Sequence, residues 1–164
     1  MRVLDLSQGT APILFRSPSG ESGEASTPVP CCWTRDGQEI LFWLRPPGSR
    51  ESALCRLTLS GEWKEILPAT PGKAYRYADV SADGSLLAYT SCEGRTCDIW
   101  VMLSAGGEPV QLTTHPAVDE APRWSPEGTK IAFTSTRSRN FDVWVMDVDV
   151  DDLHRELAKR NARQ

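Results

Sequence analysis

Short apolar runs separated by glycine-containing turns recur along the chain. Residues 87–90 and 131–134 are apolar on successive positions rather than strictly alternating, which is typical of a strand covered on both faces. Residues 99–102 and 143–146 are rich in β-branched and aromatic side chains, which favour a pleated sheet. The runs are too short for helices, so the pattern predicts an all-β protein.

The runs belong to a repeat. Residues 80–91 (VSADGSLLAYTS) align with 124–135 (WSPEGTKIAFTS) at an offset of 44 residues, and 98–102 (DIWVM) aligns with 142–146 (DVWVM) at the same offset. A more diverged copy begins at Trp33. A fixed period of this length indicates stacked structural units.

Each unit is predicted to contain four short antiparallel strands. The first two are joined by a tight turn such as 125–128 (SPEG), in which Pro fixes φ and Gly permits a left-handed backbone. The third strand follows at 99–102, and the fourth at 110–113 after the glycines of 105–107. Units of this kind pack side by side as the blades of a propeller.

One stretch of the chain resembles a known family. The string 111–113 (QLT), then 119–135 (DEAPRWSPEGTKIAFTS), then 142–147 (DVWVMD) is similar to the repeat of the TolB-like β-propeller family. The resemblance covers about residues 30–148 and is weakest before Trp33. It implies a partial β-propeller of about three four-stranded antiparallel blades, and the residues of the tail itself predict a short C-terminal helix.

Some positions depart from the family repeat. Glu127 stands where Asp is usual, Arg35 and Ala82 stand where Pro is usual, and no fourth strand is recognisable after Asp147. The last departure leaves the final blade without its outermost strand.

The ends of the chain are expected to differ from the blades. Residues 1–29 are predicted to form half a blade and a Ser/Gly/Pro-rich loop, and residues 149–164 a helical tail that caps the last blade. Beginning and stopping inside a blade favours a fragment of a longer protein; a second copy, or an arc capped by its own ends, are the alternatives. Open blade faces predict self-association.

Charge and hydropathy exclude several classes of partner. The net charge is -4 and the basic residues are scattered among acids, so no nucleic-acid partner is expected. No apolar run approaches the roughly 20 residues of a membrane span, and residues 1–10 lack the layout of a signal peptide. The family resemblance implies the bacterial cell envelope or periplasm.

The five cysteines include no C-x-x-C pair, and with two histidines in the chain a zinc site is not expected. Cys92 and Cys97 flank a predicted hairpin loop, so a disulfide between them is one alternative. The favoured interpretation is that these cysteines are free, half-buried thiols.

Motifs for catalysis and cofactors are missing from the sequence. It contains no G-x-S-x-G elbow, Walker loop or Rossmann fingerprint. Residues 147–152 imitate the opening of a calcium loop, but Asp152 and Ala158 occupy the positions where that loop needs Gly and Glu. We therefore expect no catalytic residues, no metal site and no cofactor.

The candidate binding residues lie in loops. In an antiparallel blade the longer connections share one end, and loops with aromatic and arginine side chains favour protein interfaces. That end is predicted to gather ten residues: Tyr75, Arg76, Tyr77, Arg95, His115, Asp119, Glu120, Arg137, Arg139 and Asn140.

The sequence thus predicts a non-catalytic propeller module that serves as a scaffold for a protein or peptide, as the TolB-like resemblance implies. Two alternatives remain open. The chain is the propeller portion of a prolyl-oligopeptidase-type serine peptidase, or that of a bacterial sensor or regulator, with the other domains outside these 164 residues.

Overall fold

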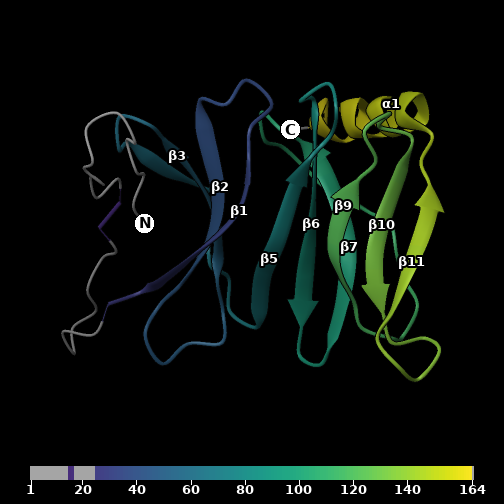
Figure 1. Cartoon of the computed structure of the whole chain (residues 1–164), viewed down its shortest axis with the longest axis horizontal. Coiled ribbons are helices and arrows are strands. Elements are labelled where there is room, and N and C mark those ends of the chain that lie inside the picture. Colours follow the sequence, from purple (N-terminus) through teal and green to yellow (C-terminus); the bar gives the residue numbers. More distant parts are fainter. Residues whose placement is uncertain (1–14, 17–24, 164) are drawn as a thin grey trace, which may run out of the picture.

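The computed structural model describes residues 15–16 and 25–163, which form eleven strands and one helix (Figure 1). The elements are β1 (Thr27–Trp33), β2 (Glu39–Arg45), β3 (Ala53–Thr58), β4 (Trp63–Leu67), β5 (Lys73–Val80), β6 (Leu86–Glu93), β7 (Thr96–Leu103), β8 (Val110–Gln111), β9 (Asp119–Trp124), β10 (Lys130–Ser135), β11 (Asp142–Asp147) and α1 (Val150–Asn161).

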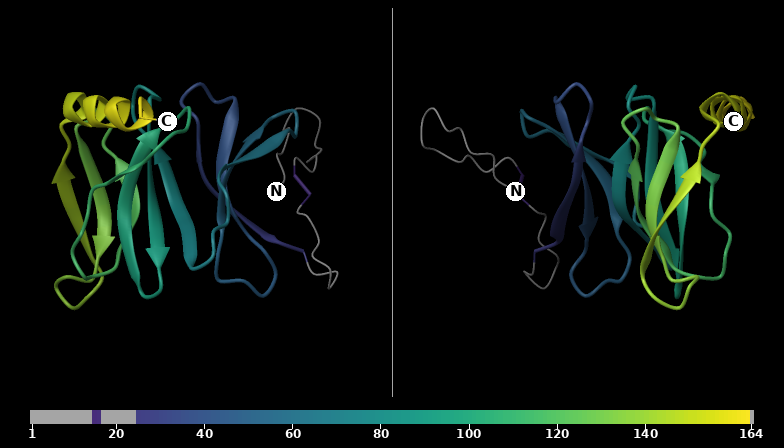
Figure 2. Two further views of the ribbon diagram at one scale, coloured as in Figure 1. Left: turned by 180° about the vertical axis from the view of Figure 1, so that it is seen from behind. Right: turned by 45° about the vertical axis from the view of Figure 1, so that its right-hand side comes forward.

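The strands form three antiparallel sheets, each ordered as in the sequence. Blade 1 is β1 to β4, blade 2 is β5 to β8, and blade 3 is β9 to β11. The blades stand side by side, and the first strands β1, β5 and β9 are neighbours (Figures 1 and 2). The predicted all-β partial propeller with a C-terminal helix is confirmed, with three strands in the described part of blade 3.

The tight turns between first and second strands repeat from blade to blade. Gly37, Gly84 and Gly128 all have positive φ, at 69°, 80° and 73°, as the turn chemistry predicts. The guanidinium of Arg35 donates hydrogen bonds to the carbonyl oxygens of Val80 and Ser81 at 2.7 and 2.9 Å. The side chain that replaces the usual Pro therefore links the turn of blade 1 to blade 2.

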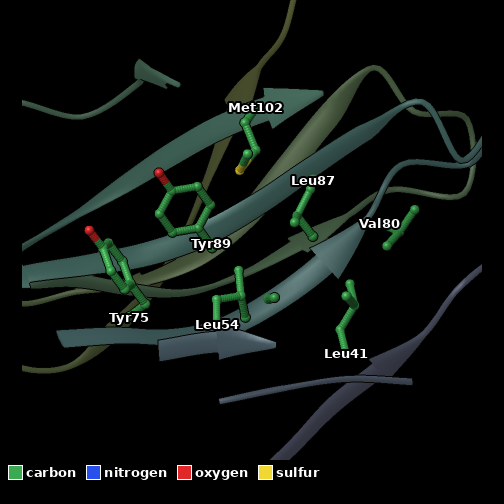
Figure 3. Close-up of a cluster of buried hydrophobic side chains, with 8 residues drawn as sticks. Leu41, Leu54, Tyr75, Val80, Leu87, Tyr89 and Met102 are labelled. Carbon is green, nitrogen blue, oxygen red and sulfur yellow. The ribbon is translucent and has the colours of Figure 1, made fainter. Parts of the chain in front are cut away.

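The core between blades 1 and 2 is apolar and closed (Figure 3). Leu41 and Leu54 of blade 1 face Leu87, Tyr89 and Met102 of blade 2. Burial of one such side chain stabilises a fold by about 1.5–3 kcal/mol, so this contact is a large part of what holds the two sheets together.

Helix α1 closes the junction between blades 2 and 3. Asp149 caps its N-terminus by accepting a hydrogen bond from the Asp152 N–H at 2.9 Å. Leu153 and Leu157 pack against a cluster that includes Leu86 of blade 2 and Ile131 of blade 3. The predicted helix is confirmed, but it covers the seam between two blades rather than the last blade alone (Figure 2). Among the described residues no helix is both long and apolar enough to cross a membrane.

The boundaries differ from expectation at the N-terminal side. Strand β1 begins at Thr27, so the expected division after residue 29 falls inside it. The predicted half blade lies mostly outside the described residues; Phe15 is described, and it packs against Phe42 on the far face of blade 1. The fourth strand of blade 2 is shorter than predicted, because only Val110 and Gln111 pair with β7.

Substitution of Gly128 tests the repeated turn. We expect Gly128→Val to lower the free energy of unfolding by about 1 kcal/mol or more, because a branched side chain is strained at positive φ. An added Cβ would meet Ala82 only at 3.7 Å, so the cost is in the backbone. Urea denaturation followed by tryptophan fluorescence measures it. Gly128→Asn is the matched control, since Asn tolerates this conformation; equal midpoints for both variants and the native chain would contradict the turn assignment.

Candidate binding site

The two ends of the blades differ in their connections. The tight turns and α1 lie at one end, at the top of Figure 1. The other end, here called the long-loop end, carries the segments 46–52, 68–72, 94–95, 112–118 and 136–141. Segments 68–72 and 112–118 at this end connect one blade to the next.

A basic cavity opens at the long-loop end between blades 1 and 2. Its volume is 510 Å³, and its walls include Arg45 from the end of β2, Arg50 from the following loop, and Lys73 and Arg76 from β5. Within the described part of the chain none of these four side chains forms an ion pair. The cavity therefore gathers an excess of positive charge on an acidic chain.

The walls of the basic cavity are held by hydrogen bonds. Glu51 accepts from the Ser49 hydroxyl at 2.7 Å and from the Gly72 N–H at 3.1 Å, and these bonds hold the pKa of its carboxyl below the usual range. The buried Ser52 hydroxyl donates to the Tyr75 carbonyl oxygen at 2.8 Å. The loop after β2 is thereby fastened to β5, so the cavity is preformed.

A disulfide joins Cys92 and Cys97 across the hairpin of β6 and β7. The favoured expectation of free thiols at these two positions was wrong. The residues pair directly across the ladder with Cα atoms 4.0 Å apart, a register that spacing alone does not fix. Cys92 and Gly94 both line the basic cavity, so the bond holds one of its walls.

The remaining cysteines are not disulfide-bonded. Cys31, Cys32 and Cys55 are free, and burial raises the pKa of Cys32 and of Cys55 to about 12. These two thiols stay protonated at neutral pH and pack as small apolar groups, as predicted for the cysteines in general.

A second polar cluster at the long-loop end is neutral. Arg137 donates to the Asp119 carboxylate at 2.6 Å, and Asp119 is 0% exposed. The guanidinium carbon lies 5.2 Å from the ring centre of Phe133 and 4.9 Å from that of Trp144. The pair ties the β10–β11 loop to the start of β9, and loss of Arg137 would leave the buried Asp119 carboxylate uncompensated.

The structure places the ten predicted residues in different surroundings. The expectation that Tyr75, Arg76, Tyr77, Asp119 and Glu120 lie on connections was wrong, because the first three belong to β5 and the last two to β9. Tyr75 is a core residue packed 5.9 Å from the Tyr89 ring, and Asp119 is buried. Of the ten predicted residues, only Arg76 lines the basic cavity. Exposed positions on hairpins and loops are occupied by Arg95, His115, Arg139 and Asn140.

The outer face of blade 3 is apolar and uncovered by described residues. Val143 and Val145 are 77% and 60% exposed, whereas Ile99 and Val101, at the same repeat positions of blade 2, are 0% exposed. Together with Ala132 and Thr134, which pair with them across the sheet, they form what we call the blade 3 end face. Figure 1 shows β11 at the right-hand margin of the arc.

The described residues contain no group of three or more His, Cys, Asp or Glu side chains placed to hold a metal ion. His115 is exposed, and its Nδ1 accepts a hydrogen bond from the Ala117 N–H at 3.1 Å. What the geometry supplies is a fixed cavity of positive charge and an apolar sheet face.

The sequence is similar to that of curated TolB proteins. A Tol-Pal system protein TolB from Anaeromyxobacter dehalogenans (strain 2CP-1) is 42% identical over 92 residues, which are 56% of this chain and 20% of the relative. The matched region thus spans about a fifth of the length of the relative. No family model matches the chain.

Solved structures share the fold. TolB from Acinetobacter baumannii superposes with a TM-score of 0.71 at 19% identity, over 90% of this chain and 35% of the other. An oligogalacturonate lyase in complex with manganese gives 0.65 at 15% identity, over 93% and 45% of the two chains. A prolyl endopeptidase gives 0.60 at 16% identity, over 89% and 22%.

At these identities the likeness shows the fold alone, and this fold is found both in TolB proteins and in enzymes. The sequence match to TolB, the internal repeat and the observed blades agree with one another. Over the 92 matched residues the chain is therefore similar to TolB proteins, and its blades have the fold of the TolB-like β-propeller.

Proposed function

We propose that the chain is part of a non-catalytic β-propeller scaffold that binds a protein or peptide at the long-loop end. The basic cavity carries the proposal, because it is preformed and because four of its side chains have no ion-pair partner among the described residues. The TolB relatives are named as members of a Tol-Pal system, which supports a protein partner.

A peptidase role is the second candidate. The likeness to a prolyl endopeptidase favours it, since this chain matches 22% of that protein. In that case the propeller would adjoin a hydrolase domain that supplies the nucleophile, because the sequence here has no nucleophile elbow. A sensor or regulator would instead carry a kinase or DNA-binding domain. The coding sequence on either side of this segment decides among the three.

We place the scaffold in the bacterial cell envelope or periplasm. The Cys92–Cys97 disulfide supports this placement, because such bonds persist in oxidising compartments.

Self-association through the blade 3 end face belongs to the same proposal. Val143 and Val145 expose apolar surface where the equivalent residues of blade 2 are covered by blade 3. A second copy, or a further blade of a longer chain, would bury that surface.

Selection from a displayed random-peptide library tests the binding function. We expect the immobilised chain to enrich peptides whose binding is lost when Arg76 and Arg95 at the long-loop end are replaced by Glu, because charge reversal there repels or unseats the ligand. Biolayer interferometry of the enriched peptides measures the loss.

The matched control carries Lys130→Glu and Arg163→Glu, which make the same change of charge near the tight-turn end. Peptides whose binding is weakened only by the control substitutions, or a selection that enriches no peptide, would rule out the long-loop end as the binding face.

Val145→Lys tests self-association. We expect the native chain to sediment with a mass that rises with concentration, and the variant to sediment as a monomer, because a charge on the blade 3 end face resists desolvation. Analytical ultracentrifugation measures both. Leu59→Lys, a change at another exposed apolar position, should leave association unaltered. A native chain that stays monomeric at all concentrations contradicts the proposal.

A further inference from the structure

We infer that the basic cavity binds an acidic peptide segment, one that presents two or more carboxylates to Arg45, Arg50, Lys73 and Arg76. This inference rests on the proposed scaffold function and deepens it by naming the chemistry of the ligand. It separates this cavity from the rest of the long-loop end as the place where specificity arises.

The charge balance of the cavity is the first argument. Among the described residues that line the cavity Glu51 is the only acid, and its two carboxylate oxygens already accept hydrogen bonds from Ser49 and Gly72. The four cations therefore exceed the acid in number, and that acid is already hydrogen-bonded. Charges in a recess are less screened than charges on an open surface, so a carboxylate that enters it gains more than it would outside.

The geometry of the cations favours carboxylates. Three of the four are arginines, whose planar guanidinium group binds a carboxylate through two parallel hydrogen bonds. The Arg45 guanidinium carbon lies 5.9 Å from the ring centre of Trp43, a contact that restricts its orientation. An arginine that is already oriented loses less side-chain entropy when a ligand binds.

The size and surroundings of the cavity favour a short segment of peptide. A volume of 510 Å³ lies within the roughly 300–1,000 Å³ typical of ligand pockets, which suits a few residues rather than a folded domain. The whole chain carries a net charge of -4. An extended polyanion such as nucleic acid, or an anionic membrane, would be repelled by the acidic surface beyond the cavity. A short segment keeps its charges within a Debye length, about 8 Å, of the cavity cations.

The wall contributed by blade 2 is covalently fixed. Gly94 lines the cavity at the tip of the β6–β7 hairpin, and the Cys92–Cys97 disulfide closes that hairpin directly behind it. The opposite wall is fastened by the Ser52 hydrogen bond to Tyr75. A site that is fixed in this way needs little reordering to bind.

The second cluster at the long-loop end lacks this capacity. Arg137 is engaged by Asp119 at 2.6 Å and by the Ser135 hydroxyl at 2.9 Å, so its charge is compensated within the fold. We therefore expect acidic ligands to bind the basic cavity in preference to the Arg137 cluster at the same end of the molecule.

Fluorescence anisotropy of labelled peptides tests the inference on the full chain. One peptide alternates Asp and Glu with Gly, and its isosteric partner carries Asn and Gln instead. We expect the acidic peptide to bind about tenfold or more tightly than the amide peptide, with an affinity that falls as NaCl is raised. The double variant Arg45→Glu/Lys73→Glu should weaken binding of the acidic peptide by a factor of about ten or more.

The control variant Lys64→Glu/Arg163→Glu makes the same change in net charge away from the cavity and should retain the native affinity. Arg45→Gln/Lys73→Gln serves as a milder second variant, and circular dichroism of each protein checks that it is folded. Equal losses in the cavity and control variants would mean unspecific attraction and would overturn the inference.

Two further results bear on the ligand class. Equal or tighter binding of a single-stranded oligonucleotide, or of vesicles containing phosphatidylserine, through the same four residues would overturn the assignment to acidic peptides. If library-selected peptides bind the long-loop end but are neutral and insensitive to the cavity variants, the inference fails while the scaffold function stands. If no peptide binds at that end, both fail.

Discussion

The structure depends on the burial of one blade face against the next. Ile99 and Val101 are fully buried while Val143 and Val145, at the same repeat positions, are largely exposed, so neighbouring blades and not residue type decide the difference. Apolar burial contributes about 25 cal/mol per Å², and a single small sheet cannot provide enough of it alone. Helix α1 adds cover where blades 2 and 3 meet, through Leu153 and Leu157.

The candidate site is a product of the same stacking. The basic cavity lies where the loop after β2 meets the start of β5, so its shape depends on the seam between blades 1 and 2. Its side chains come from two blades, and neither blade alone would bring Arg45 near Lys73. The shape of the cavity at this end is therefore coupled to the packing that stabilises the arc, whereas the tight-turn end is occupied by turns and a helix.

The sequence predicts what is local and repeats. The turns at Gly84 and Gly128, the strands after them and the helix after Asp149 follow from short-range chemistry, and the structure has all of them. The basic cavity could not be predicted from the sequence, because Arg45, Arg50 and Lys73 meet only through tertiary packing and carry no motif. Tyr75 and Asp119 were assigned to loops because the first strands have no clean apolar run; burial of Asp119 depends on Arg137, a partner distant in the sequence.

The position of the Cys92–Cys97 bond determines which part of the protein would change if the disulfide were reduced. It closes a hairpin with a sequence separation of 5, for which loop entropy gives roughly 2 kcal/mol. The disulfide lies outside the two large apolar cores between the blades and packs in a small separate cluster with Ala74 and Val118. Opening this one bond would thus loosen the hairpin tip beside the cavity and leave the stacked cores in place.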